Sequence, residues 1–382
     1  MSGKRFGRPQ VFALLLLSAY VLQSCWVIHR TAARWAEAAY AQAGLDQLAG
    51  KILARDAGAQ PVPAAVAAAP IVVAHPFAAS LPPDTLKWML RLPFVAIGWL
   101  LGASIWYVAR RLYGNAGGYI ALALYCFSPA VLFPWPGPLL TGSLGIFGTI
   151  FVSVAAAHTL YAPSGATISE LRSRWRRIIL LGLAIALAVG SGLWAISLVL
   201  LGLAFMLYLV PERRSASLAL VLSACAVAFV LLLGCCGFRP RVLMAAIGHA
   251  SPFHQDLIGG EVARSYIVGI RHAQNPVLLV LAAVALIAYF SWKRCRFFGN
   301  TAPLVSLLAV SALGLGVYID VLVGPFPFRA TSFLYVFIGG VYADLLESRR
   351  GSIFGLLLLG LLAAYAVVSI MAVLRLRASV LF

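Results

Sequence analysis

The chain has 382 residues, of which 62% are hydrophobic and only 10% are charged, and its mean hydropathy is +0.96. A soluble core does not need so much apolar residue, and repeated apolar runs of about 17–22 residues match the thickness of a bilayer core. The composition therefore predicts an all-α polytopic membrane protein. It excludes a membrane β-barrel, whose sequence would show short alternating segments.

The net charge of +18 has two sources. Lys and Arg mark the cytoplasmic loops of membrane proteins, and we assign most of the excess to this topological role. Recognition of phosphate outside the membrane would explain a part of it. Nucleic acid is not an expected partner, because the basic residues are scattered between apolar runs instead of gathered on one soluble face.

The residue types that hold metals are poorly placed for that role. The six cysteines lie mostly inside or at the ends of apolar runs, with no CxxC pair and no cysteine–histidine ligand spacing. His249 and His254 have no carboxylate at ligand spacing. We therefore expect no metal site at these residues and no bound cofactor, and the sequence leaves open whether a divalent metal takes part.

The first apolar run follows a basic segment, Met1–Gln10, as a signal peptide would. However, the run is long for a signal peptide, and Ser24-Cys25-Trp26 offers no small-x-small cleavage site. We predict an uncleaved first span.

Apolar runs and turns predict eleven spans. They lie near residues 11–29, 88–109, 117–134, 139–161, 178–190, 192–209, 216–236, 275–291, 303–323, 329–346 and 352–373. The run 178–209 is too long for one ordinary span and short for two, and Gly190-Ser191-Gly192 in its middle is typical of a turn. A hairpin there places more than half of the 29 Lys and Arg residues in short segments on one side, whereas a single span would move Lys293–Arg296 outside. The positive-inside tendency favours the hairpin, with the N-terminus in the cytoplasm and the C-terminus outside, in a bacterial inner or plasma membrane.

Two long outer segments, 30–87 and 237–274, then belong to a single transmembrane domain over residues 1–382. The first has helical periodicity over Arg34–Leu53 and continues into the Ala/Pro-rich stretch Pro61–Pro83. That stretch is either a linker or, because it is apolar, a segment that lies on the membrane surface or packs over the bundle. Long polar loops on a compact bundle are uncommon unless they have a function.

Four short motifs follow one another in the first half of the chain. They are Arg91-Leu92-Pro93 at the start of a span, Val108–Gly114 at its end, the glycine-containing run Ala116–Leu124, and Phe127-Ser128-Pro129. Their order and spacing over residues 88–161 resemble the C-type glycosyltransferase fold. The resemblance is closest to the dolichyl-phosphate-mannose-protein mannosyltransferases and the bacterial aminoarabinose transferases. Weaker similarities occur at Gly182–Trp194 and at Pro327-Phe328-Arg329.

The resemblance implies transfer of a sugar from a polyprenyl-phosphate carrier, as substrate, to an acceptor at the outer face. Such a reaction needs a carboxylate to take the acceptor's proton. It also needs cationic groups that hold the leaving phosphate, and a lateral groove that admits the lipid tail. Membrane lipids and the lipid-linked sugar are thus the expected partners.

The chain departs from this family at its catalytic acids. The family's first acidic pair aligns with Thr31 and Ala32, and glycine stands at Gly142, where a second aspartate is usual. Neither threonine nor glycine can act as a carboxylate base. Glu37 is the nearest substitute and Asp46 the next, although a local structural role is also open for Glu37.

Basic residues near the predicted outer edge are candidates for binding the phosphate. They are Arg329, Arg264, Arg271, His272 and Arg91. For Arg329 the alternative is snorkelling of its side chain to the lipid headgroups. Asp256 and Glu261 are either solvated or, if the base has moved, further candidates for it. A charge on Asp320 is costly in a membrane, so we expect it to pair, for instance with Arg329, or to face an aqueous cleft.

Three functions follow from these observations. The first is a glycosyltransferase that uses a polyprenyl-phosphate-linked sugar with a displaced base. The second is a catalytically degenerate member of the same fold that binds lipid or acts as a scaffold. A transporter is disfavoured, because intramembrane charges are few and no pair of broken helices recurs in matching halves.

Overall fold

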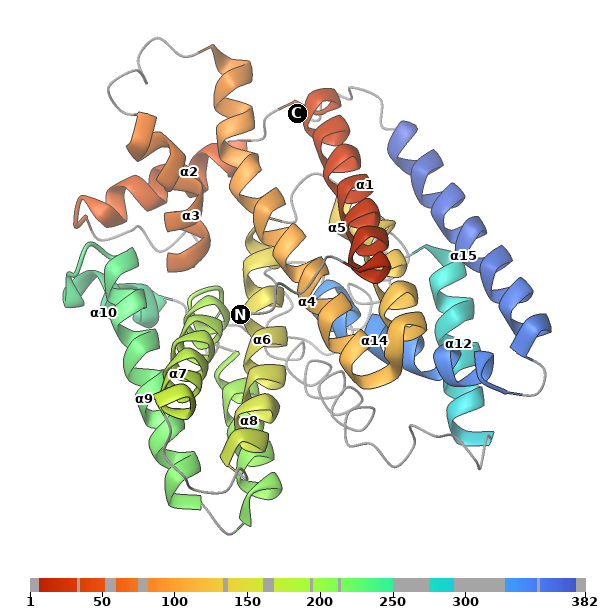
Figure 1. Ribbon diagram of the computed structural model, residues 1–382. Helices are drawn as coiled ribbons and strands as arrows, with labels where there is room; N and C mark the ends of the chain where they lie inside the picture. Colours follow the sequence, from red (N-terminus) through yellow and green to blue (C-terminus); the bar gives the residue numbers. More distant parts are fainter. Residues whose placement is uncertain are drawn as a thin grey trace, which may run out of the picture. The chain divides into compact units, whose positions relative to one another are not determined.

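The computed structural model describes eleven stretches of the chain. They are residues 7–32, 35–51, 60–74, 82–132, 137–160, 168–192, 195–211, 214–249, 275–291, 327–348 and 351–375. In these stretches all regular structure is helical, as predicted, and there is no strand. The chain, whose helices are labelled in Figure 1, divides into two compact units. Unit 1 is Met1–Ala32, Gly98–Pro136 and Leu257–Phe382, and unit 2 is Ala33–Ile97 and Gly137–Asp256. How the units join into the expected single domain stays a prediction.

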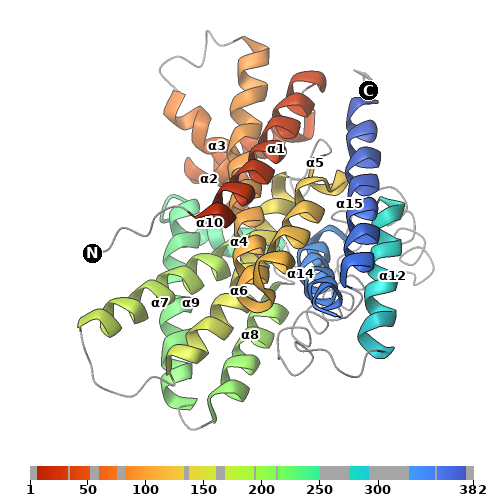
Figure 2. The same cartoon turned by 45° about the vertical axis from the view of Figure 1, so that its right-hand side comes forward.

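Unit 1 is built from helices at both ends of the chain. They are α1 (Arg8–Arg30), the second part of α4 (Pro83–Cys126), α5 (Pro129–Leu132), α12 (Pro276–Ser291), α14 (Pro327–Leu346) and α15 (Gly351–Leu374). The last three pack against one another, as Figure 2 shows. Asn275, just before α12, donates from Nδ2 to the carbonyl of Tyr365 and to Ser369 Oγ, both at 3.0 Å, which fixes the start of α12 on α15.

The helix α4 reverses its direction at Gly114. This residue has φ 78° and ψ −173°, a conformation that glycine adopts easily because it has no Cβ. The two arms fold back on each other, so that the backbone at Gly118 lies against Arg110 and the backbone at Gly102 lies against the Tyr125 ring. The predicted spans 88–109 and 117–134 are thus the two arms of a helical hairpin.

A break between α4 and α5 organises the core of unit 1. The helix α4 ends at Cys126, so carbonyls in its last turn lack their helical donors. Side chains of other helices replace those donors: the Tyr365 hydroxyl donates to Leu124 O at 3.0 Å, and Gln23 Nε2 donates to Cys126 O at 3.3 Å. Because hydrocarbon offers no water to satisfy these carbonyls, the bonds hold α1 and α15 around the break.

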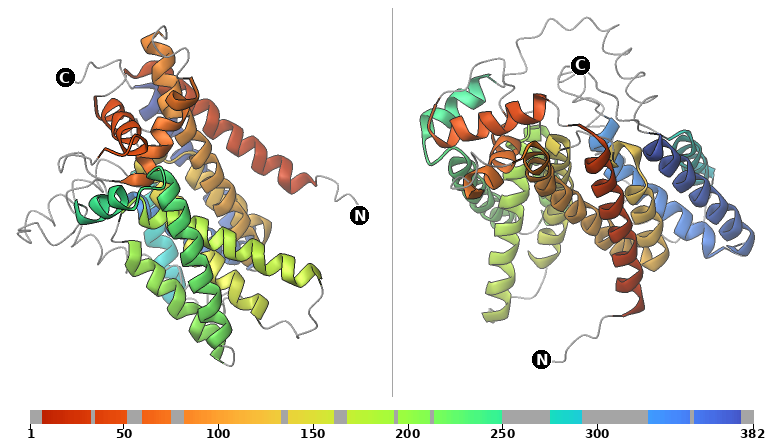
Figure 3. Two further views of the ribbon diagram at one scale, coloured as in Figure 1. Left: turned by 90° about the vertical axis from the view of Figure 1, so that its left-hand side faces the viewer. Right: turned by 90° about the horizontal axis from the view of Figure 1, so that it is seen from above.

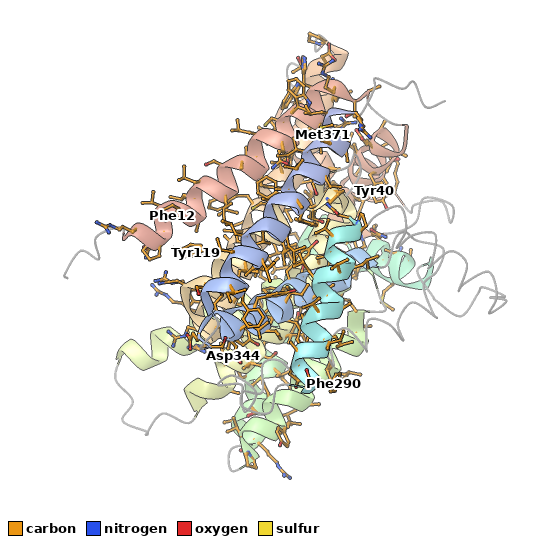
Figure 4. The ribbon with its side chains drawn as sticks, turned by 90° about the vertical axis from the view of Figure 1, so that its right-hand side faces the viewer. Phe12, Tyr40, Tyr119, Phe290, Asp344 and Met371 are labelled. Carbon is orange, nitrogen blue, oxygen red and sulfur yellow. The ribbon has the colours of Figure 1, made fainter. Side chains whose placement is uncertain are left out.

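The outward surface of unit 1 is apolar. Figure 4 shows Met371 on α15 and Phe290 on α12, and both side chains are exposed. Phe12 of α1 and Tyr119 of α4, labelled in the same view, form an edge-on ring pair with centroids 6.1 Å apart. A wide apolar surface of this kind is unfavourable in water and suits lipid.

Among the residues that the structure describes, five helices are long and apolar enough to cross a membrane: α1, α4, α6, α9 and α15. The chain is therefore an integral membrane protein. The predicted spans on the described residues overlap helices, and 117–134 runs through the second arm of α4 and α5; that there are eleven spans stays a prediction. The predicted span 303–323 lies outside the described residues.

Unit 2 contains a second helical bundle. It is made of α2 (Trp35–Leu48), α3 (Pro61–Ala74), the first part of α4, α6 (Gly137–Leu160), α7 (Ile168–Val189), α8 (Ile196–Leu209), α9 (Arg214–Cys235) and α10 (Pro240–His249). The helix α7 packs against both α6 and α9. The chain turns between α7 and α8 at Gly190–Gly192, where a turn was predicted; that the run 178–209 crosses the membrane twice stays a prediction.

The part Pro61–Ala74 of the Ala/Pro-rich stretch is a helix, so the interpretation as a linker is wrong for these residues; residues 75–81 lie outside the described residues. Val62, Ala64, Ala67 and Ala68 of α3 are buried, and α3 packs against α6 and α9. This confirms the alternative, a segment packed over the bundle. The helices α2 and α3 approach each other closely because the residues between them are small. A Cβ added at Gly44 of α2 would lie within 3 Å of the α3 backbone.

Candidate functional site

Three chain segments that are far apart in the sequence meet at one end of unit 2. Gln47 of α2 donates from Nε2 to Cys235 O at 2.6 Å and to Pro61 O at 3.2 Å. Arg239, which precedes α10, donates to Ala49 O just beyond α2. The backbone N–H of Val62 donates to Gly190 O at 3.1 Å. Figure 1 shows α2, α3 and α10 gathered at the end of α9.

This meeting agrees with the pattern of charge in the sequence. We assigned the basic segments to the cytoplasmic side of the membrane. This assignment predicts that residues 30–87, the turn at 190–192 and residues 237–274 all lie on the outer side. The bond from Arg239 to Ala49 O joins residues 237–274 to residues 30–87, and the bond from Val62 to Gly190 O joins residues 30–87 to the turn. We therefore take this end of unit 2 as the candidate functional site.

Glu37 and Arg91, two predicted site residues, form a buried ion pair. Arg91 Nη2 donates to Glu37 Oε1 at 2.8 Å, while Arg91 Nε donates to Oε2 at 2.9 Å and to Oε1 at 3.1 Å. Only 1% of the Glu37 side chain and 11% of the Arg91 side chain are exposed. Both carboxylate oxygens thus contact one edge of a single guanidinium, the bidentate geometry that favours such pairs.

The pair joins α2 to the Arg91-Leu92-Pro93 motif of the resemblance. Glu37 lies in the first turn of α2, where a carboxylate also interacts favourably with the helix dipole. Arg91 opens the Arg91-Leu92-Pro93 motif in the first arm of α4. A general base must lie within about 3 Å of the proton that it takes. A carboxylate this deeply buried against Arg91 is not presented to a substrate, so the geometry favours a structural role for Glu37.

Asp46 belongs to a different part of α2. Its Oδ1 accepts hydrogen bonds from Lys51 Nζ at 3.1 Å and from Gln42 Nε2 at 3.2 Å. It lies nine residues after Glu37, which corresponds to about 13 Å along the axis and about half a revolution around it. The two acids therefore cannot act on the same atom while α2 keeps this form.

Thr31, which aligns with one of the family's acids, ends α1. Its Oγ1 donates to Val27 O at 2.7 Å, and its backbone N–H donates to the same carbonyl at 3.0 Å. A threonine hydroxyl can close the last turn in this way, whereas an ionised aspartate has no proton to donate. Threonine at this position thus stabilises the C-terminal end of α1.

The other aligned position, Gly142, faces the α7–α8 turn. A Cβ there would lie only 3.2 Å from Ser191 Cβ. Beside it, Ser191 Oγ donates to Thr141 Oγ1 at 2.9 Å, and both side chains are buried. The place of the second family acid is therefore filled by a close helix contact and a neutral hydroxyl pair.

The predicted phosphate-binding residues other than Arg91 stay predictions. Arg329 lies in the first turn of α14, but its side chain is not among those described. Arg264, Arg271 and His272 lie outside the described residues, as do Asp256, Glu261 and Asp320. Among the residues that the structure does describe, no three His, Cys, Asp or Glu side chains group as metal ligands.

Sequence reasoning missed Gln47, Arg239 and Ser191 as residues that build this end of the unit. A lone glutamine in an alanine-rich helix carries no signal of a contact that lies 188 residues away. Ser191 did stand in a recognised turn, but its hydroxyl partner came from another helix.

No protein-family model matches this chain, and no curated protein matches it. The resemblance to C-type glycosyltransferases accordingly rests on the order and spacing of its motifs.

Proposed function

We propose that this protein is a membrane glycosyltransferase-like protein that takes a polyprenyl-phosphate-linked sugar at the outer face of a bacterial inner membrane. It crosses the membrane eleven times, with its N-terminus in the cytoplasm and its C-terminus outside. Arg329, Arg264, Arg271 and His272 contribute positive charge toward the phosphate. The transferred sugar's acceptor is bound at the same face.

One observation carries the proposal. The first outer segment is folded into α2 and α3, and Glu37 ties it to the arginine of the Arg91-Leu92-Pro93 motif. The motif that resembles the transferase family is thus tied by a buried ion pair to the segment that the charge pattern assigns to the outer side. Prepositioned groups of this kind lower the cost of ordering a binding site.

A second candidate function is a catalytically degenerate relative that binds the lipid or serves as a scaffold. The environment of Glu37 and the neutral residues Thr31 and Gly142 favour this candidate. Both candidates share the lipid-phosphate ligand and differ in whether a sugar is transferred.

Turnover of lipid-linked sugars by the purified protein in nanodiscs separates the two candidates. We expect Glu37→Gln, which preserves the shape of the side chain, to leave any wild-type turnover largely unchanged once its folded fraction is matched to wild type. Loss of turnover in a folded Glu37→Gln protein would make Glu37 the base after all. Unchanged turnover directs the search to Asp46, Asp256 and Glu261, while binding without turnover supports the degenerate relative.

Binding of a polyprenyl-phosphate analogue tests the class itself. Arg329→Ala should weaken binding by about 1–3 kcal/mol, or roughly 5- to 150-fold, if a charge-assisted bond to phosphate is lost. Arg214→Ala, at the start of α9, is the matched control and should bind as wild type does. Equal affinity in all three proteins would assign Arg329 to snorkelling, and no binding in any of them would count against the class.

Cysteine labelling tests the topology. A probe cysteine placed between Pro211 and Ala216 should react only after the cytoplasmic side is made accessible. Labelling from outside would show that the hairpin at Gly190–Gly192 does not cross the membrane twice.

A further inference from the structure

The helix α10 leaves α9 through a tight turn. At the end of α9, Gly237 N donates to Gly234 O at 3.1 Å and Phe238 N donates to Leu233 O at 2.7 Å, the two bonds of a Schellman motif. Gly237 and Phe238 have φ values of 59° and 56°. The chain therefore changes direction within two residues, and Figure 3 shows α10 turned away from the axis of α9.

Phe238 is unusual in this turn. The left-handed region is sterically disfavoured for a residue with a Cβ, and for a bulky residue it is a genuine outlier. Its side chain is also 69% exposed. A strained backbone that presents a large apolar ring outward is a reason to look for a function at this position.

The residues of α10 have two different environments. Val242, Leu243 and Ala246 are buried within unit 2. Met244 is 65% exposed and Arg241 is exposed. Phe238 and Arg239 are exposed too, so two large apolar and two cationic exposed side chains lie within residues 238–244; we call these four residues the α10 patch.

The position of the patch identifies the chemistry of its partner. It begins three residues beyond the last residue of α9, a 22-residue candidate span, and therefore lies where that span leaves the hydrocarbon. At this depth apolar rings and thioethers enter the acyl boundary, while arginine reaches the phosphates. Arg239 contacts Ala49, and the described acid nearest to Ala49 in sequence is Asp46. Asp46 is already paired with Lys51, so it does not neutralise the positive charge of the patch.

We propose that the α10 patch binds the headgroups of anionic phospholipids. Phe238 and Met244 insert at the acyl boundary, and Arg239 and Arg241 pair with the phosphates. Arg239 also donates to Ala49 O, so lipid bound here connects to the end of α2. The proposal does not depend on whether the chain binds a polyprenyl-phosphate sugar.

Site-resolved photocrosslinking tests this inference. The full chain, with p-benzoylphenylalanine at Met244, is placed in nanodiscs that mix phosphatidylcholine with a minor fraction of phosphatidylglycerol, and the lipid adducts are analysed by mass. The same probe at Val280, an exposed position of α12, reports the bulk lipid ratio. We expect phosphatidylglycerol to be enriched about fivefold or more at position 244 relative to position 280.

Charge variants identify the source of the enrichment. Arg241→Gln should remove most of the enrichment at position 244, whereas Arg214→Gln, at the opposite end of α9, should preserve it. Equal melting temperatures of the variants would show that the fold is retained. Three outcomes would each overturn the proposal. The adducts at position 244 could have the bulk lipid ratio, they could form with protein alone, or the enrichment could survive in the double variant Arg241→Gln with Arg239→Gln.

Discussion

Removal of one partner from the Glu37–Arg91 pair should be strongly destabilising. In Glu37→Ala the Arg91 guanidinium stays largely buried, with 11% of its side chain exposed in the native protein, and loses the three hydrogen bonds that Glu37 accepts. Breaking a buried pair in this way typically lowers the free energy of unfolding by 3–5 kcal/mol, about as much as a leucine-to-alanine cavity in a core. Because Arg91 retains a little exposure, we expect a value near 3 kcal/mol.

The magnitude can be measured by titrating the protein in mixed micelles with denaturing detergent and following helix loss. Lys51→Ala breaks the more exposed pair with Asp46 on the same helix α2 and should change stability by less than about 1 kcal/mol. Replacement of both buried partners, Glu37→Leu with Arg91→Met, should recover most of the loss, since no charge is then left unpaired. A loss below about 0.5 kcal/mol in Glu37→Ala, or a double variant no more stable than the single one, would refute the buried pair.

Two further predictions use the same assay. Tyr365→Phe removes the donor to the buried carbonyl of Leu124 and should lower the free energy of unfolding by about 1–3 kcal/mol; no change would mean that another donor satisfies that carbonyl. Gly145→Ala should lower it by about 1–3 kcal/mol or more, because its Cβ would lie 2.2 Å from the backbone nitrogen of Ala188. Gly360→Ala, whose Cβ would meet nothing within 4 Å, should instead raise stability by roughly 0.5–1 kcal/mol, and a Gly145→Ala protein as stable as this control would contradict the close packing of α6 on α7.

The membrane class and the positions of the long apolar helices followed from the sequence alone, whereas α5 and α10 were not predicted. An apolar run of sufficient length must become a helix in hydrocarbon, because only a helix satisfies its own backbone groups there. The turn at Gly190–Gly192 and the reversal near Gly114 were also accessible, since glycine and the basic segments act locally. The segment Pro61–Ala74 could not be decided in this way, because its alanines and prolines suit either a linker or a packed helix.

Only the tertiary structure decided which residues meet. Glu37 contacts Arg91 across 54 residues, Gln47 contacts the end of α9 across 188, and Tyr365 contacts the break after α4 across 241. Periodicity assigns a residue to a helix but does not reveal which face of which helix it meets. That choice depends on close contacts between small residues in the folded bundle, such as Gly145 against Ala188. The nearest carboxylate to a missing acid could therefore be named from the sequence, but its burial against arginine could not.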